Sequence, residues 1–232
     1  MAKRKPPVVN PITKNNLELP KISPKTDNQA AFFDLYEQYQ HHFLLGPAGT
    51  GKTFLALTKA LGSLADNEAS KLTIFRSSVA SRNEGFLPGT AAEKMAVFET
   101  PYISNVNKIF GRDDAYGILS KIGTINFESS AYQRGNTLEN QIVIIDEAQN
   151  LTGHELDTLI TRTGENSRLI ICGDLAQQDL TKHGEKNVYK AFQVLQSLPS
   201  VATTEFDLND IVRSGLVREY LIAKHLTYPQ GY

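Results

Sequence analysis

Short apolar runs alternate along the chain with longer segments in which apolar residues recur at helical spacing. Apolar runs that end in glycine or polar residues are typical of strands buried on both faces of a parallel sheet. The sequence predicts such strands at residues 42–45, 71–75, 122–127, 142–145, 168–172 and 202–206. It predicts helices at residues 26–36, 52–64, 152–160, 187–198 and 216–224, with another from residue 90. This alternation indicates an α/β fold, a mostly parallel sheet sandwiched by helices with right-handed crossovers.

Polar residues predict where two of these helices begin. Asp27 or Asn28 is expected to cap the first helix, and Thr152 with Glu155 fits a capping box for a later one. Pro101 is expected to break or kink the helix in which it lies, because proline cannot donate the backbone hydrogen bond.

The length of 232 residues allows one fairly large domain, which we place at residues 25–232. Residues 1–24 carry several prolines with scattered lysine and arginine, which predicts an extended basic arm. This arm is either a solvated tail or a segment that swaps a strand or touches phosphate. No apolar run approaches a membrane span of about 18 residues, and the basic residues 2–7 have no apolar core behind them. We therefore expect a cytoplasmic protein.

Charge and cysteine content narrow the function classes. The net charge of −1 restricts any nucleic-acid site to a local patch. The single cysteine, Cys172, lies in an apolar run and is expected to be a small buried hydrophobe. One cysteine excludes an internal disulfide framework and a cysteine-based zinc site.

A glycine-rich segment follows the first predicted strand and leads directly into a predicted helix. It has the pattern G-x-x-x-x-G-K-[ST] of a P-loop. Glycine lets the backbone close round a polyphosphate, and N–H groups at a helix start favour its negative charge. We expect Lys52 to reach the β- and γ-phosphates of ATP and the Thr53 hydroxyl to ligate Mg²⁺. The nucleotide-contacting residues of this segment are expected to be Gly46, Pro47, Ala48, Gly49, Thr50, Gly51, Lys52, Thr53 and Phe54.

A pair of acidic residues follows the clearest predicted strand, residues 142–145. We expect this strand to lie beside the P-loop strand and to deliver Asp146 to Mg²⁺ as a Walker B element. Glu147 is then placed to orient or deprotonate the attacking water. The alternative is an acidic helix cap after a core strand.

Two side-chain amides are candidate nucleotide contacts. Gln177 follows the next strand and is the candidate sensor of the γ-phosphate or its attacking water. Gln29 lies near a helix start shortly before the P-loop strand, where its donor and acceptor could read an adenine edge. The alternative for Gln29 is a polar residue of the first helical turn.

Two polar loops leave predicted strands at the edge where open α/β sheets place ligands. Arginine and hydroxyl side chains in such loops suit contacts with a phosphate backbone. The candidate contacts to single-stranded nucleic acid are Arg76, Ser77, Arg82, Arg134 and Thr137.

These motifs, in this order, resemble the first RecA-like domain of superfamily 1 helicases and, more closely, the PhoH family of phosphate-starvation-inducible ATPases. The matching segments are residues 46–53, 85–89, 134–138, 146–150, 159–164, 173–174 and 210–213. Asn136 departs from the family pattern, which has arginine there. The resemblance implies a RecA-like P-loop NTPase, ATP and Mg²⁺ as ligands, a cytoplasmic location and a link to RNA. A single domain without the family's appended RNA-binding or nuclease-type domains would suit a bacteriophage-encoded member.

We therefore expect Mg²⁺-dependent ATP hydrolysis coupled to binding or remodelling of single-stranded nucleic acid, with RNA favoured. One alternative is a P-loop phosphotransferase; Glu147 after Asp146, and the lack of an obvious arginine-rich lid in the sequence, stand against it. The other alternative is a nucleotide-switched binding module with little turnover.

The number of RecA-like domains leads to an expectation about assembly. The resembled helicases close the ATP site with arginines from a second such domain, whereas the length here is used up by one. We expect a neighbouring subunit to supply the missing arginine in a head-to-tail ring, a hexamer. Arg213, just before the last predicted helix, is the first candidate for this arginine finger; Arg134 and Arg162 are the alternatives.

Overall fold

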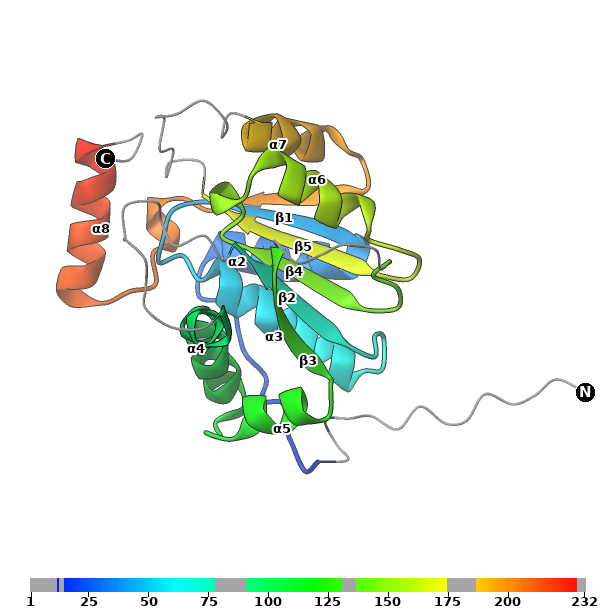
Figure 1. Ribbon diagram of the computed structural model, residues 1–232. Coiled ribbons are helices and arrows are strands. Elements are labelled where there is room, and N and C mark those ends of the chain that lie inside the picture. Colours follow the sequence, from blue (N-terminus) through cyan, green and yellow to red (C-terminus); the bar gives the residue numbers. More distant parts are fainter. Residues whose placement is uncertain (1–11, 13–14, 78–90, 131–136, 175–186, 229–232) are drawn as a thin grey trace, which may run out of the picture.

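A parallel sheet forms the centre of the protein (Figure 1). A computed structural model describes residue 12 and residues 15–77, 91–130, 137–174 and 187–228. Within these ranges the strands are β1 (His41–Leu45), β2 (Leu72–Arg76), β3 (Ile125–Ser129), β4 (Ile142–Asp146), β5 (Arg168–Gly173) and β6 (Val201–Glu205). They lie in the order β3-β2-β4-β5-β1-β6, and every neighbouring pair is parallel.

Helices cover both faces of this sheet (Figure 1). They are α2 (Asp27–Gln38), α3 (Lys52–Ala65), α4 (Ala91–Phe110), α5 (Ala115–Lys121), α6 (Gly153–Thr161), α7 (Asn187–Ser197) and α8 (Gly215–Thr227), with 3₁₀ turns η2 (Ala148–Asn150) and η3 (Leu208–Asp210). Helices α2 to α5 pack in one apolar cluster with the sheet, and α6 and α7 pack in a second. None of the described helices is both long and apolar enough to cross a membrane.

Strand β4 shows why the strands read as continuous apolar runs. Ile142 and Ile144 belong to the first cluster, whereas Val143 and Ile145 belong to the second. Successive side chains point to opposite faces, and both faces are buried. The predicted α/β class with a parallel sheet between helices is confirmed.

All six predicted strands are present, and the largest difference in their bounds is at β3. That strand was expected from residue 122 but begins at Ile125. Helix α5, which the pattern did not predict, occupies the preceding residues and ends with Ile122 as its C-cap, an exposed residue. The sequence pattern therefore included Ile122 in the strand, although this exposed residue ends the short helix α5.

Thr26, and not Asp27 or Asn28, is the N-cap of α2. Its Oγ1 accepts a hydrogen bond of 3.3 Å from the Gln29 backbone N–H. The Asn28 amide donates instead to Asp210 Oδ2 at 2.7 Å. Asn28, which the sequence suggested as a cap, therefore makes a long-range hydrogen bond with Asp210 and does not cap the helix.

Helix α4 runs without a break through Pro101, so the expected break is wrong, while a kink at this residue stays a prediction. The turns after the proline are anchored in the core by Tyr102 and Val106, both fully buried. Their burial compensates for the one backbone hydrogen bond that proline cannot make. The capping box of Thr152 and Glu155 at the start of α6 is confirmed.

The order of the strands differs from the expectation at one point. Strand β5 lies between β1 and β4, so the strand that carries Asp146 is not beside the P-loop strand. Leu45 at the end of β1 pairs with Gly173, and Ile145 of β4 pairs with Ile171. Hydrophobic runs show that strands are buried but not which strands are neighbours. Because all three strands are parallel, they still end at the same edge of the sheet.

The described part of the predicted arm packs on the domain and is not a solvated tail. Ile12 and Leu17 are each 1% exposed and belong to the cluster beneath α2 to α5. Leu19 and Ile22 pack against the same cluster. Residues 1–11 and 13–14 of the arm lie outside the described residues.

Candidate nucleotide-binding site

The P-loop joins the end of β1 to the start of α3 at the carboxyl edge of the sheet. Gly46 has φ +147°, and a Cβ there would lie 2.5 Å from the Phe206 carbonyl oxygen. Gly51 is the N-cap of α3 and has a left-handed backbone, with φ 90°. Glycine takes both conformations without strain. The loop therefore turns tightly over the start of α3, where N–H groups and the helix dipole favour a polyphosphate.

The Lys52 side chain folds back over the loop that precedes it. Its Nζ donates hydrogen bonds to the carbonyl oxygens of Gly46 at 2.6 Å and Pro47 at 3.0 Å. The Thr50 hydroxyl also donates to the Pro47 carbonyl, at 3.0 Å. Phosphate oxygens are stronger acceptors of charged hydrogen bonds than these carbonyls. This arrangement of an ammonium group and a glycine-rich turn fits a nucleoside triphosphate.

Asp146 links the P-loop helix to α4. The Thr53 hydroxyl donates to Asp146 Oδ1 at 2.9 Å, and the Tyr102 hydroxyl donates to Oδ2 at 2.8 Å. Burial raises the pKa of Tyr102, as does the neighbouring Asp146 charge, so this hydroxyl stays protonated. Mg²⁺ prefers oxygen ligands, and the Thr53 and Asp146 oxygens fit it. Sequence reasoning missed Tyr102, because only the folded chain shows what a buried tyrosine contacts.

Glu147 directly follows the strand and lies half-buried in the site. Its backbone is left-handed, with φ 52°. Burial raises the pKa of the Glu147 carboxyl and Asp146 raises it further, while Arg76, a hydrogen bond from Gln149 and Lys52 lower it. The net shift is upward, so this carboxyl accepts a proton more readily than a free glutamate.

Gln149 connects Glu147 to the end of β5. Its Nε2 donates to Glu147 Oε2 at 2.6 Å, and its Oε1 accepts from the Asp174 backbone N–H at 3.0 Å. The sequence showed Gln149 only as part of a family motif, with no role, since Asp174 is distant along the chain.

Gln29 lies against the P-loop, as the prediction of a nucleotide contact requires. Its side chain is 3% exposed, and its Nε2 donates to the Thr50 carbonyl at 3.0 Å. Its Oε1 accepts from the Lys25 backbone N–H at 2.9 Å. The amide therefore ties α2 to the loop, and its contact with adenine stays a prediction.

The segment before α8 packs over the P-loop of its own chain. The Val212 N–H donates to the Gly49 carbonyl at 3.1 Å. A Cβ on Gly49 would lie 3.3 Å from Arg213 Cγ and 2.9 Å from Leu221 Cδ1. The exposed Arg213 thus stands beside the P-loop of its own chain, and its role as an arginine finger stays a prediction.

Buried Asp210 holds this covering segment to α2. Its Oδ1 accepts from the Thr26 hydroxyl, and its Oδ2 accepts from the Asn28 amide and, at 2.8 Å, from the Asp207 backbone N–H. Segments far apart along the chain therefore meet beside the P-loop.

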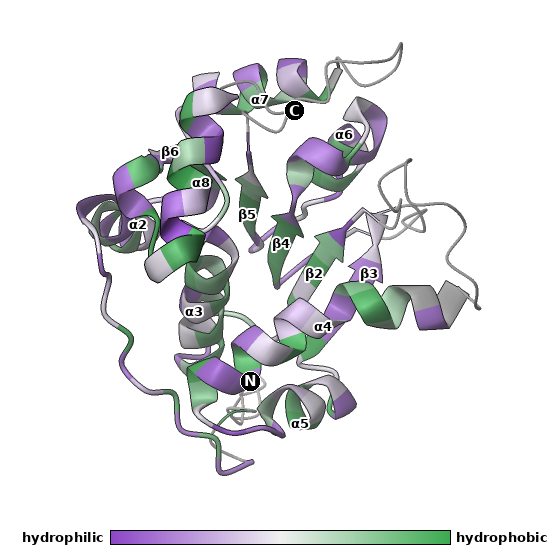
Figure 2. Ribbon diagram, turned by 90° about the vertical axis from the view of Figure 1, so that its left-hand side faces the viewer, coloured by the Kyte–Doolittle hydropathy of each residue, from purple (hydrophilic) through white to green (hydrophobic). Residues whose placement is uncertain are grey.

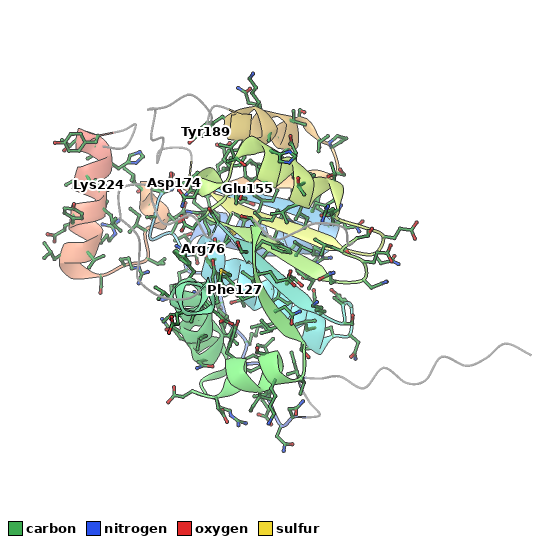
Figure 3. All side chains as sticks on the ribbon, viewed as in Figure 1. Arg76, Phe127, Glu155, Asp174, Tyr189 and Lys224 are labelled. Carbon is green, nitrogen blue, oxygen red and sulfur yellow. The ribbon has the colours of Figure 1, made fainter. Side chains whose placement is uncertain are left out.

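The candidate nucleic-acid residues that the structure describes, Arg76, Ser77 and Thr137, differ in position and exposure. Arg76 pairs in register with Asp146 at the carboxyl edge of the sheet, the edge where Figure 3 also places Asp174. Ser77 is buried, which argues against direct contact with phosphate. Thr137 is exposed, but the next residue, Leu138, pairs with a residue ahead of β5. Thr137 therefore lies toward the amino ends of the strands, away from Arg76.

Of the remaining candidate residues, only Arg162 lies among the described residues. Arg162 is the C-cap of α6, at the end of the helix that leads to the amino end of β5. That position is remote from the P-loop on the same chain. Gln177, Arg82 and Arg134 lie outside the described residues.

A parallel sheet with a P-loop after β1 and an Asp-Glu pair at the end of β4 defines the chain as a P-loop NTPase of the α/β class. The family model described as PhoH-like protein matches residues 21–224. The chain therefore belongs to the PhoH family, which confirms the resemblance seen in its motifs.

Relatives support this assignment. The PhoH-like protein of Bacillus subtilis (strain 168) is 35% identical over 213 residues, 91% of this chain and 66% of that protein. The PhoH-like protein of Synechocystis sp. is 34% identical over 203 residues, 87% of this chain and 62% of that protein. The chain thus spans less than two thirds of the length of these curated relatives. The solved structure of Bacteroides Pif1 bound to ssDNA aligns with a TM-score of 0.41 and 11% identity, over 91% of this chain and 48% of that chain. The family assignment rests on the sequence matches.

Proposed function

We propose that this protein hydrolyses ATP at the P-loop with Mg²⁺, in the cytoplasm. The observation that carries the proposal is the 2.9 Å hydrogen bond between Thr53 and Asp146, residues that are far apart in the sequence. It brings a P-loop hydroxyl and a strand-end carboxylate to one point, as Mg²⁺-dependent phosphoryl transfer requires. Membership of the PhoH family supports the same reading.

Each side chain of the site has a role in this proposal. Bound Mg²⁺ supplies charge neutralisation on the β- and γ-phosphates. Thr53 and Asp146 hold the ion, Lys52 holds the phosphates, and Glu147 orients the attacking water and accepts its proton. The Tyr102 hydroxyl fixes the second oxygen of Asp146.

Three further residues act on the nucleotide. Gln29 reads the adenine edge and Gln177 senses the γ-phosphate. Arg213 contacts the nucleotide in cis, from its place beside Gly49.

Hydrolysis is coupled, in our proposal, to binding or remodelling single-stranded nucleic acid, with RNA favoured. Support comes from the family resemblance and from Arg76, which presents a cation at the carboxyl edge next to the Walker B carboxylates. A nucleic acid bound at that edge would lie within reach of the groups that act on ATP.

We also propose that the active form is a head-to-tail ring, a hexamer. Helix α8 lies in front of the carboxyl edge and has no buried residue (Figure 2). Its Leu216 and Leu226 are 79% and 68% exposed, and Val217 and Tyr220 are more than half exposed. An apolar surface of this kind beside the nucleotide site suits a contact with the next subunit.

The experiment that tests the proposed function is phosphate release from ATP and Mg²⁺ with no acceptor, alone and with RNA, single-stranded DNA or duplex DNA. The proposal predicts release by the protein alone and stimulation by single strands, most by RNA. Release only when a small acceptor is added would indicate a phosphotransferase. ATP binding with no turnover under every condition would indicate a nucleotide-switched binding module.

A further inference from the structure

One peptide group at the end of β5 connects the P-loop to the side chains that follow β4. The carbonyl of Gly173 accepts a hydrogen bond of 3.2 Å from the Gly46 N–H, at the start of the P-loop. The N–H of the same peptide group, which belongs to Asp174, donates to Gln149 Oε1 at 3.0 Å. Gln149 Nε2 in turn donates to Glu147 Oε2 at 2.6 Å. A continuous series of hydrogen bonds thus runs from the P-loop through the end of β5 to Glu147.

The Gln149 amide has one orientation that satisfies both partners. A backbone N–H can only donate, so the atom that faces Asp174 must be the amide oxygen. The NH₂ group must then face Glu147, whose Oε2 accepts its hydrogen bond. Rotating the amide by half a turn would break both bonds. Two unlike partners therefore fix this side chain without ambiguity.

The backbone between Glu147 and Gln149 is also held in a fixed conformation. Gln149 lies in the 3₁₀ turn η2, which starts directly after Glu147. The Asn150 N–H donates to the Glu147 carbonyl at 2.9 Å, which closes the turn. A fixed amide on a short turn can hold the carboxylate at a defined distance from the P-loop.

We propose that Gln149 is a positioning residue, which sets the place of the Glu147 carboxylate relative to the P-loop through the Gly173–Asp174 peptide group. The inference rests on the proposed function, in which Glu147 orients the attacking water. Because this carboxylate orients the attacking water in the proposed function, its place relative to the P-loop sets where the water is held. A misplacement of about 1 Å can cost on the order of 100-fold in rate.

The test compares Gln149→Leu and Gln149→Glu in steady-state ATP hydrolysis. Leucine removes both of these bonds, whereas glutamate keeps an oxygen for the Asp174 N–H, loses the donor to Glu147 and adds a negative charge beside it. We expect kcat to fall about tenfold or more in both variants, while KM for ATP and the affinity for a non-hydrolysable ATP analogue change less than about twofold. Gln196→Leu is the matched control, because that amide also donates to a glutamate, Glu205, at an exposed site.

The pattern across variants separates positioning from a structural role. If Gln149 merely tied β5 to η2, Gln149→Glu would retain the wild-type kcat, and that result would overturn the inference. Loss of nucleotide affinity in step with kcat would overturn it as well. In a Glu147→Gln background, Gln149→Leu should cause no further loss in the single-turnover rate. Wild-type protein without hydrolysis would contradict the proposed function, whereas active wild type with unchanged Gln149 variants would contradict only this inference.

Discussion

The Thr53 hydroxyl donates a 2.9 Å hydrogen bond to Asp146 Oδ1 and so joins the first turn of α3 to the end of β4. The two residues come from strand-loop-helix units that are separated in the sheet by β5. Parallel strands end at one edge, so residues that follow different strands can still meet. This one contact places the metal-binding oxygens beside the phosphate-binding loop.

Removing the Lys52 ammonium should abolish hydrolysis and weaken ATP binding. Lys52→Ala deletes the cation that lies over the P-loop carbonyls of Gly46 and Pro47. Titration with a fluorescent ATP analogue should show at least a tenfold loss of affinity, about 1.4 kcal/mol. The exposed Lys190→Ala on α7 is the control and should bind normally. Equal affinity in wild type and Lys52→Ala would remove Lys52 from the phosphate site.

Removing the Tyr102 hydroxyl should weaken Mg²⁺ binding and change the packing of the ring little. Tyr102→Phe keeps the ring, whose centroid is 5.2 Å from that of Phe127, and leaves Asp146 Oδ2 without its donor. The loss of a hydrogen bond to a charged group costs about 1.5–3 kcal/mol. We expect the Mg²⁺ concentration for half-maximal hydrolysis to rise severalfold. Tyr116→Phe, which removes a hydroxyl that donates to Glu99, is the control and should not shift it.

His42 should make the fold sensitive to acid. Burial lowers the pKa of His42 to about 4 from an ordinary value of 6.5. Between these values the unfolded chain binds more protons, so stability is lost as the pH falls from 6.5 to 4, by about 3 kcal/mol. His42→Phe keeps an aromatic ring beside Tyr36 and removes the titration. Urea unfolding at pH 7.5 and 4.5 should show a smaller loss of unfolding free energy for this variant than for wild type. The exposed His154→Leu is the control and should lose as much as wild type. Equal losses in wild type and His42→Phe would contradict the role of His42.

Gly46 and Gly62 should respond to alanine in opposite directions. A Cβ on Gly46 meets the Phe206 carbonyl at 2.5 Å in a conformation that disfavours side chains, whereas nothing lies within 4 Å of a Cβ on Gly62, inside α3. Gly46→Ala should lower the free energy of unfolding by about 1–3 kcal/mol and impair nucleotide binding. Gly62→Ala should raise it by about 0.5–1 kcal/mol. Chemical denaturation measures both, and a Gly46→Ala variant as stable as wild type would contradict the tight turn.

Local sequence patterns predicted the strands and the P-loop of this protein, but not which strands are neighbours or which distant side chains are in contact. The apolar runs and the P-loop spacing gave the strands and the residues of the loop, because two-sided burial and glycine conformations are encoded locally. The neighbour of β1, the partner of Tyr102 and the orientation of Gln149 depend on contacts between distant segments. Arg213 shows the same limit: its place before a helix was predicted, but its position beside Gly49 follows from the Asp210 contacts with α2.

The most direct test of the central claim compares wild type with Glu147→Gln for ATP binding and for phosphate release in the presence of Mg²⁺. The substitution keeps the shape of the side chain and leaves Thr53 and Asp146 in place, but it removes the group that accepts the proton. We predict unchanged affinity for ATP and phosphate release at least about 100-fold slower than wild type. Phosphate release by Glu147→Gln at the wild-type rate would contradict this account of the site.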